Sequence, residues 1–231
     1  MKPGAILSYL QMCSQEGVNL QRGMNYHLRG GVSVILMSLR PGAPYADRIE
    51  DNGRVLIYEG HDMPRRRGSS DPKMLDQPMA NPNRTLTQNG LFYQAAISHK
   101  ETGSQPEIVR VYEKVRPGIW VYNGLFKLVD SWLERDRHRK VFKFRLQLAD
   151  DSDDLDSTQE DLEHTRLIPA SVKLQVWQRD KGMCVICGSI DNLHFDHIVP
   201  YSKGGSSLVA ANIRLLCARH NLAKSDRIEY A

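Results

Sequence analysis

The side chains best suited to bind a metal lie in two short pairs near the C-terminal end of the chain. Cys184 and Cys187 are separated by two residues, and Cys217 and His220 repeat this spacing farther along. Zinc prefers four tetrahedral thiolate and imidazole ligands, and two such pairs joined by a loop can close around one ion. The spacing therefore predicts a structural Zn²⁺ site.

The loop between the two pairs holds a second set of polar residues. Asp196 and His197 are adjacent and lead into an Ile-Val-Pro run, which a Gly-Gly pair follows. Asn212 comes just before Cys217, and Asn221 comes directly after His220. Imidazole titrates near neutral pH, and carboxylate or amide oxygens suit hard divalent cations. These residue types are those that metal-assisted hydrolysis of a phosphodiester requires.

In order and spacing, this region resembles the HNH endonuclease family. The resemblance implies that His197 is the general base and that Asp196 and Asn221 bind one Mg²⁺ or Mn²⁺ ion. It also implies that Asn212 either fixes the loop or orients the ring of His197. The alternative for Asp196 and His197 is an ordinary surface pair.

The same segment is expected to form a small ββα-metal domain stabilised by the zinc ion, because a domain of this size buries little apolar surface. We expect a helix capped by Ser171, a strand over Leu193–Val199 and a helix over Cys217–Lys224. On that last helix, Lys224 lies three residues beyond Asn221 and is expected to contact a flanking phosphate.

The chain before residue 149 has mainly strand signals. Its apolar runs are short, rich in β-branched and aromatic residues, and bounded by Gly, Pro or Asn. The predicted strands are Gly31–Leu39, Arg54–Tyr58, Ile108–Tyr112, Trp120–Tyr122 and Phe142–Leu148. The last of them alternates strictly between apolar and polar residues. With a helix around Asn83 to Ala96, the prediction is an α+β protein with an N-terminal barrel or sandwich.

Several landmarks in this part occur in a specific order. They are Gly31-Val-Ser-Val-Ile-Leu36, Glu50-Asp-Asn-Gly53, Ile57-Tyr-Glu-Gly60 and Tyr122-Asn-Gly-Leu-Phe126. Over roughly residues 20–148 the ordered set resembles the SRA or YDG domain, a family of readers of modified cytosine. The resemblance implies a β-barrel with a concave face that takes a flipped cytosine out of the duplex.

The resemblance also implies which residues form the pocket. Carried over to this chain, they are Tyr45, Asp47 and Tyr58. A carboxylate can accept from the N4 amino group of cytosine, and tyrosine rings can sandwich the base. The alternative is that both tyrosines simply pack the barrel. Arg65 and Arg66 lie in a basic loop, which either contacts phosphate or a groove of the DNA or is a solvated run of charge.

The formal net charge of +4 conceals an uneven distribution. Of 27 acidic residues, eight lie between Ala149 and Glu163, where no basic residue occurs. The rest of the chain then has 31 basic and 19 acidic residues, a balance of about +12 that favours a polyanion such as nucleic acid. A basic protein without such a partner is the alternative. The acidic stretch predicts a flexible linker over 149–168 between domains at 1–148 and 169–231.

Cysteine usage and hydropathy indicate the compartment. Three of the four cysteines fall in the paired motif and Cys13 is left over, a pattern of reduced thiols that bind metal. No apolar stretch has the length of a membrane span or a secretory signal, so we expect a cytoplasmic protein without a membrane partner.

Together these observations predict an endonuclease that recognises 5-methylcytosine or 5-hydroxymethylcytosine in double-stranded DNA by base flipping and cuts nearby, as a restriction enzyme of modified foreign DNA would. Cutting both strands requires two active sites or two binding events, so a homodimer is expected. Two alternatives remain open. One is a noncatalytic reader of methylated DNA, and the other is an HNH nuclease indifferent to modification.

Overall fold

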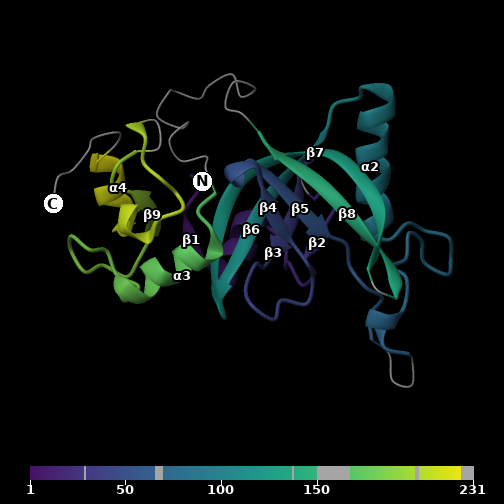
Figure 1. The fold of residues 1–231 in the computed structure, drawn as a ribbon, viewed down its shortest axis with the longest axis horizontal. Helices are drawn as coiled ribbons and strands as arrows, with labels where there is room; N and C mark the ends of the chain where they lie inside the picture. The colour runs from purple at the N-terminus through teal and green to yellow at the C-terminus, as the bar shows by residue number, and fades with distance from the viewer. Residues whose placement is uncertain (29, 66–69, 137, 150–166, 201–202, 225–231) are drawn as a thin grey trace.

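The structure is a computed structural model that describes residues 1–28, 30–65, 70–136, 138–149, 167–200 and 203–224. Its first domain is a strongly curved sheet (Figure 1). Its strands are β1 (Ile6–Ser8), β2 (Met24–Asn25), β3 (Ser33–Met37), β4 (Arg48–Glu50), β5 (Val55–Glu59), β6 (Glu107–Arg116), β7 (Ile119–Asp136) and β8 (Arg139–Leu148). The hydrogen-bonded order is β2-β3-β6-β7-β8-β5-β4, and β1 pairs with β7. Within the described residues no ladder joins β2 to β4, so the barrel is open between these strands.

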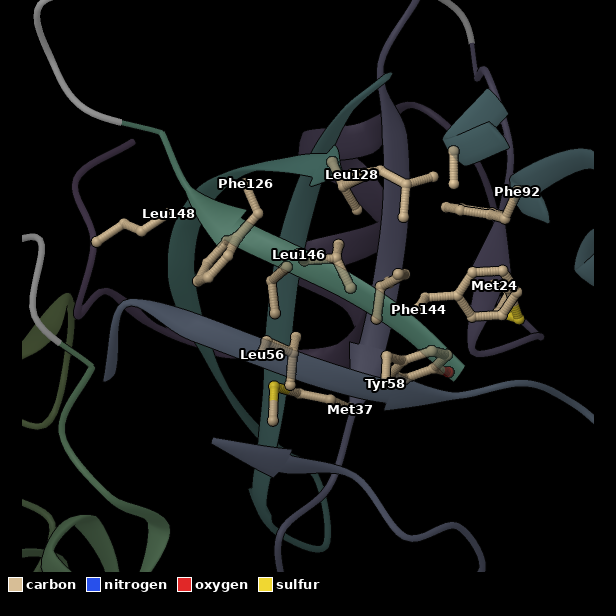
Figure 2. Close-up of a cluster of buried hydrophobic side chains, with 14 of the residues drawn as sticks. Met24, Met37, Leu56, Tyr58, Phe92, Phe126, Leu128, Phe144, Leu146 and Leu148 are labelled. Atoms are coloured by element: carbon tan, nitrogen blue, oxygen red, sulfur yellow. The ribbon is translucent and has the colours of Figure 1, made fainter. Parts of the chain in front are cut away.

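The inner face of this sheet holds the main hydrophobic core (Figure 2). Strand β8 contributes Phe142, Phe144, Leu146 and Leu148, the apolar positions of the predicted alternation. Helix α2 (Gln88–Thr102) covers the core with Phe92 and other apolar residues. The alternation along β8 thus orients the sheet as the sequence predicted.

Three features differ from the elements expected from the sequence. Helix α2 begins at Gln88 rather than near Asn83, because the Thr87 side chain caps it by accepting from the amide of Gly90. Strand β7 continues far beyond Tyr122 and pairs along most of its length with β8. An additional helix, α1 (Tyr9–Glu16), has a capping box between Ser8 and Gln11.

The second domain is built from two helices and a two-stranded ladder. Its elements are α3 (Ala170–Arg179), β9 (Leu193–His197), β10 (Ile213–Cys217) and α4 (Ala218–Lys224). Strands β9 and β10 are antiparallel, with Ile213 opposite His197. Ser171 does not cap α3, because the helix already begins at Ala170, after Pro169. Strand β10 was not predicted, although it provides half of the ladder.

The two domains share a hydrophobic cluster. Val115 and Val121 from the first domain pack with Ile168, Val172 and Phe195, which come from the other side of the boundary. The N-terminal segment also joins the two sheets through backbone hydrogen bonds. The amide of Gly4 donates to the carbonyl of Tyr122 at 2.8 Å, and the carbonyl of Gly4 accepts from the amide of Phe195 at 3.2 Å. The N-terminal strand therefore lies between the barrel and the ββα unit, as Figure 1 shows.

A buried ion pair lies at this domain boundary. Lys173 on α3 is 2% exposed, and its ammonium contacts the carboxylate of Glu113, which is fully buried on β6. The Asn123 side chain completes the group: its oxygen accepts from Lys173 at 2.8 Å, and its nitrogen donates to Glu113 at 3.0 Å. Both charges are thus compensated where water is excluded, which such burial requires.

The predicted linker is described only at its ends. Residues 150–166 lie outside the described part of the chain, so its flexibility remains a prediction. At its C-terminal end, Leu167 packs into the barrel core and Ile168 into the cluster between the domains. Among the described residues, no helix is long and apolar enough to cross a membrane.

Replacing Lys173 with Met should lower the free energy of unfolding by about 3–5 kcal/mol, because Glu113 would keep a buried charge without its partner. Urea denaturation would measure this loss. Gln175→Met is the matched control, because Gln175 is exposed on the same helix. Equal stability of the two variants would contradict a structural role for the ion pair.

Candidate functional site

The four residues predicted to bind zinc come together at one end of the second domain. The ligand atoms of Cys184, Cys187, Cys217 and His220 all lie within 4.8 Å of one another. The sulfur atoms of Cys187 and Cys217 are 3.8 Å apart, and Nδ1 of His220 is 3.3 Å from the sulfur of Cys217. A tetrahedron with zinc–sulfur bonds of about 2.3 Å has sulfur–sulfur edges of about 3.8 Å. The cluster therefore fits one zinc ion.

The local backbone also favours a thiolate in this cluster. Burial alone would raise the pKa of Cys184, but hydrogen bonds from the backbone amides of Cys217, Cys187 and Ile186 outweigh it and lower the pKa to about 6. The turn is closed by the amide of Gly188, which donates to the carbonyl of Cys184 at 2.8 Å. A thiolate, not a thiol, is the form that binds a metal.

The polar residues of the ββα unit lie on β9 and α4. Asp196 is 1% exposed and accepts from Arg214 on β10 at 3.3 Å and from Lys224 on α4 at 3.0 Å. Burial raises the pKa of Asp196, and the two cations oppose that rise. The two cations thus compensate the charge of a carboxylate that is removed from water.

Hydrogen bonds hold the imidazole of His197 and the loop after it. Nε2 of His197 lies 2.7 Å from the hydroxyl of Ser207. The Asn212 side chain bonds both backbone groups of Val199, accepting at 2.8 Å and donating at 3.0 Å. A Cβ at Gly205 would lie 1.7 Å from the carbonyl oxygen of Val199, so only glycine fits there. Asn212 therefore fixes the loop, and Ser207 holds the ring.

Asn221 lies on α4, which packs on β9, the strand that carries Asp196. The residue is 7% exposed, and its side-chain oxygen has no hydrogen-bond partner among the described residues. Buried polar atoms in native proteins rarely remain without a partner, so this atom suits a ligand or ion. Carboxylate and amide oxygens match the preferences of Mg²⁺ and Mn²⁺. The donor set thus fits the hard divalent cation expected from the sequence.

Lys224 differs from its expected place at an exposed phosphate-binding surface. The residue is 3% exposed, and its ammonium bonds the carboxylate of Asp196 and the backbone carbonyl of His197. The reason is that α4 packs on β9 and turns this side chain inward, toward the buried acid. In this structure Lys224 is a counterion of Asp196, and an expected contact with phosphate requires it to move.

The first domain contains a separate cavity of about 620 Å³. Of the residues expected in the base pocket, Tyr45 and Asp47 line this cavity, and Tyr58 does not. Three basic residues, Arg22, Arg40 and Lys114, also contribute to its lining. The cavity lies within the usual size range of ligand sites and combines apolar walls with a few charged groups.

Asp47 is positioned by two backbone amides. One carboxylate oxygen accepts from the amide of Glu59 at 3.0 Å, and the other accepts from the amide of Ser38 at 3.2 Å. Burial raises the pKa of Asp47 to about 7, with a smaller contribution in the same direction from Glu59, while these hydrogen bonds and the charge of Lys143 oppose it. The carboxyl group can therefore change protonation near neutral pH.

Tyr58 belongs to the hydrophobic core rather than to the cavity surface. It is 1% exposed and packs with residues such as Leu56 and Phe144 (Figure 2). Tyr45 is partly exposed and stacks on His61, with 4.8 Å between ring centroids and 11° between ring planes. The alternative in which a tyrosine packs the barrel thus applies to Tyr58, and the base sandwich expected from Tyr45 and Tyr58 does not form here.

The basic loop lies mostly beyond what the structure describes. Arg65 is exposed and directly follows Pro64, which lines a second cavity. Arg66 lies outside the described residues, so its contact with DNA remains a prediction.

Sequence reasoning missed three residues of these sites. Ser207 and Arg214 contact His197 and Asp196, and no spacing rule marks a serine in a loop or a cation on an unpredicted strand. No motif in the sequence marks His61, although it lines the cavity. Its position directly after the landmark ending in Gly60 was the one available signal.

Two family models match separate parts of the chain. The family model of the SAD/SRA domain matches residues 1–152, so the chain belongs to the SAD/SRA domain family. The family model of the HNH endonuclease matches residues 184–227, and the second domain is accordingly an HNH endonuclease domain. Both resemblances identified in the sequence are confirmed.

Similar solved structures include the SRA domain of SUVH5 in complex with fully methylated CG DNA, at 26% identity and a TM-score of 0.44, with 64% of this chain and 88% of that chain covered. The SUVH5 SRA domain bound to fully hydroxymethylated CG DNA has 25% identity and a TM-score of 0.41, covering 64% and 91%. Arabidopsis thaliana SUVH6 in complex with SAM has 20% identity and a TM-score of 0.42, covering 75% and 28%. No curated protein matched the chain.

Substitution of Cys217 by Ser should abolish stoichiometric zinc and unfold the second domain, because a small domain depends on its metal for stability. Elemental analysis of the purified protein and limited proteolysis between the domains would measure both effects. Cys13→Ala is the control, since Cys13 lies outside the cluster. Full zinc content in the Cys217 variant would contradict the assignment of this cluster as the zinc site.

The raised pKa of Asp47 predicts a pH-dependent stability. Its folded-state pKa of about 7 exceeds the ordinary value, so the stabilisation is complete at low pH and is lost as the pH rises through 7. Between pH 5.5 and 8 this loss should be about 1–2 kcal/mol. Urea denaturation of wild type and Asp47→Asn at both pH values isolates the effect, because His61 and other groups titrate in both proteins. The same pH dependence in the variant would disprove the assignment.

Proposed function

We propose that this protein is a modification-dependent DNA endonuclease. In this proposal the SRA domain takes a modified cytosine, 5-methylcytosine or 5-hydroxymethylcytosine, out of the duplex, and the HNH domain hydrolyses a nearby phosphodiester bond. The single observation that carries the proposal is the presence, in one chain, of a cavity with apolar walls and a few charged groups in the SRA domain and a buried acid–imidazole–amide set in the HNH domain.

The cavity has the chemistry that a flipped cytosine needs. Flipping costs a few kcal/mol of stacking and pairing, which the pocket must return. Asp47 can accept from the N4 amino group, and the stacked rings of Tyr45 and His61 contribute aromatic surface to the lining of the same cavity. The hydroxyl of Ser38 and Nε of Arg40, two residues of the lining, are buried without partners among the described residues. Such atoms favour a polar ligand over an empty apolar space.

The HNH residues have complementary roles in the proposed reaction. His197, held by Ser207, accepts the proton of the attacking water. Asp196 and Asn221 hold the Mg²⁺ or Mn²⁺ ion, which when bound supplies Lewis acidity at the scissile phosphate. Asn212 keeps the loop after β9 in place, and Lys224 can leave Asp196 to contact phosphate. The Cys₃His cluster binds a structural Zn²⁺ ion.

A homodimer remains part of the proposal. One HNH site hydrolyses one strand at a time, so a double-strand break requires a second site or a second binding event. A cytoplasmic restriction function against modified foreign DNA would use such a break.

The proposal is tested by incubating matched duplexes, with cytosine or 5-methylcytosine at a single site, with Mg²⁺ or Mn²⁺. Wild type should cut the methylated duplex preferentially. His197→Ala should cut it at least about 100-fold more slowly, because the general base is lost, while its affinity for the DNA is retained. Gel electrophoresis of end-labelled strands measures the rate and the position of each cut.

Two other outcomes would replace the proposal. Preferential binding of the methylated duplex by wild type without any cutting would indicate a noncatalytic reader. Equal cutting of both duplexes would indicate a nuclease indifferent to modification.

A further inference from the structure

His61 lies just beyond the end of β5, at the boundary between two cavities. The cavity of about 620 Å³ and a second one of about 360 Å³ are both lined by Arg22, Tyr45 and His61. The imidazole is nearly parallel to the ring of Tyr45, at a centroid distance of 4.8 Å. The stacked pair therefore forms part of the wall that the two cavities share.

Three further contacts hold His61, two of them at its ring and one at its backbone. Its Nε2 lies 2.8 Å from the hydroxyl of Tyr58. The Asn89 side chain bonds both the amide and the carbonyl of His61, at 2.8 Å each. Gly23 lies against the ring so closely that a Cβ there would be 2.6 Å from its Cε1 atom. These contacts fix the ring as a wall, whereas a movable cover would have few of them.

The ring is also neutral and keeps one polar atom unused. Burial lowers the pKa of His61 to about 4, although the charge of Asp62 opposes this. Nε2 is engaged by Tyr58, and no described residue bonds Nδ1. Nδ1 is then a donor or an acceptor, depending on the tautomer. Tyr45 covers one face of this uncharged ring, so a nucleobase would meet the remaining aromatic surface and the edge that carries Nδ1.

We propose that His61 is a specificity-determining residue of the base pocket and that Tyr58 positions it. This inference rests on the proposed function and deepens it. It gives Tyr58 a role other than the base sandwich: its hydroxyl holds the imidazole, and the imidazole contacts the base. Asp47 lies in the same cavity, so a carboxylate for the exocyclic amino group and an aromatic wall come from one site.

The test measures equilibrium binding of the full-length protein to duplexes with cytosine or 5-methylcytosine at one position. All variants are made in a His197→Ala background, so that the DNA stays intact. His61→Ala should reduce the preference for the methylated duplex by about tenfold, the scale of one lost base–aromatic contact. His61→Phe keeps a flat aromatic ring, so the preference for the methylated duplex should fall by less. His99→Ala, a histidine on α2 away from the cavity, should lose nothing.

The role of Tyr58 has its own readout. Tyr58→Phe removes only the hydroxyl. It should weaken the preference for the methylated duplex when His61 is present, but should have no further effect when His61 has been replaced by Ala. Zinc content and melting temperature, measured for each variant, separate this coupling from misfolding. Additive effects of the two substitutions would overturn the positioning role.

The outcomes distinguish this inference from the proposed function. Suppose that the His197→Ala protein prefers methylated DNA. If the added His61→Ala substitution leaves this preference unchanged, or strengthens binding to the methylated duplex because the ring had blocked the cavity, only the role of His61 is overturned. If the His197→Ala protein binds both duplexes equally, the proposed recognition of modified cytosine fails together with the role of His61.

Discussion

The arrangement of this protein depends on the buried contact between its two domains. Lys173 of the HNH domain places its ammonium against Glu113 and Asn123 of the SRA domain, where solvent is excluded. A charge buried in this way is tolerated only while its partner stays in place, so the ion pair holds α3 in one position. Around the ion pair, the shared apolar cluster adds hydrophobic contacts between the domains. The N-terminal segment adds backbone hydrogen bonds to both sheets. His197 lies close to this boundary, because it lines a small cavity with Asn123 and Lys173. The proposed cutting site and the proposed reading site are therefore parts of one packed unit.

Removal from water shapes both sites in the same way. In the cavity, burial raises the pKa of Asp47 and lowers that of His61, so each group is shifted toward its neutral form. In the HNH domain, burial raises the pKa of Asp196, and Lys224 with Arg214 limits the rise. Desolvated polar groups bind their ligands more strongly than exposed ones, because competing water is absent. Under the proposed function, these desolvated groups are the ones that an incoming base or cation would contact.

The sequence predicted those parts of the sites that depend on short spacing. The zinc ligands form two close pairs, and a pair two residues apart can reach one ion whatever surrounds it. Asp196 and Asn221 were found as metal-binding candidates because their order along the chain resembles a known motif. The strict alternation of β8 fixed which face of that strand is buried, and the structure confirms it. Tyr58 was assigned to the pocket surface, but its position on β5 turns the ring into the core.

By itself, the sequence determined the two families, the cysteine–histidine cluster and the polar set of the HNH domain, since each depends on residue types at local spacings. Only the tertiary structure decided which partners these residues have. Lys224 contacts Asp196, Ser207 holds His197, and His61 stacks on Tyr45 because distant segments pack together. Side-chain orientation and desolvation are properties of that packing, and no local pattern in the chain encodes them.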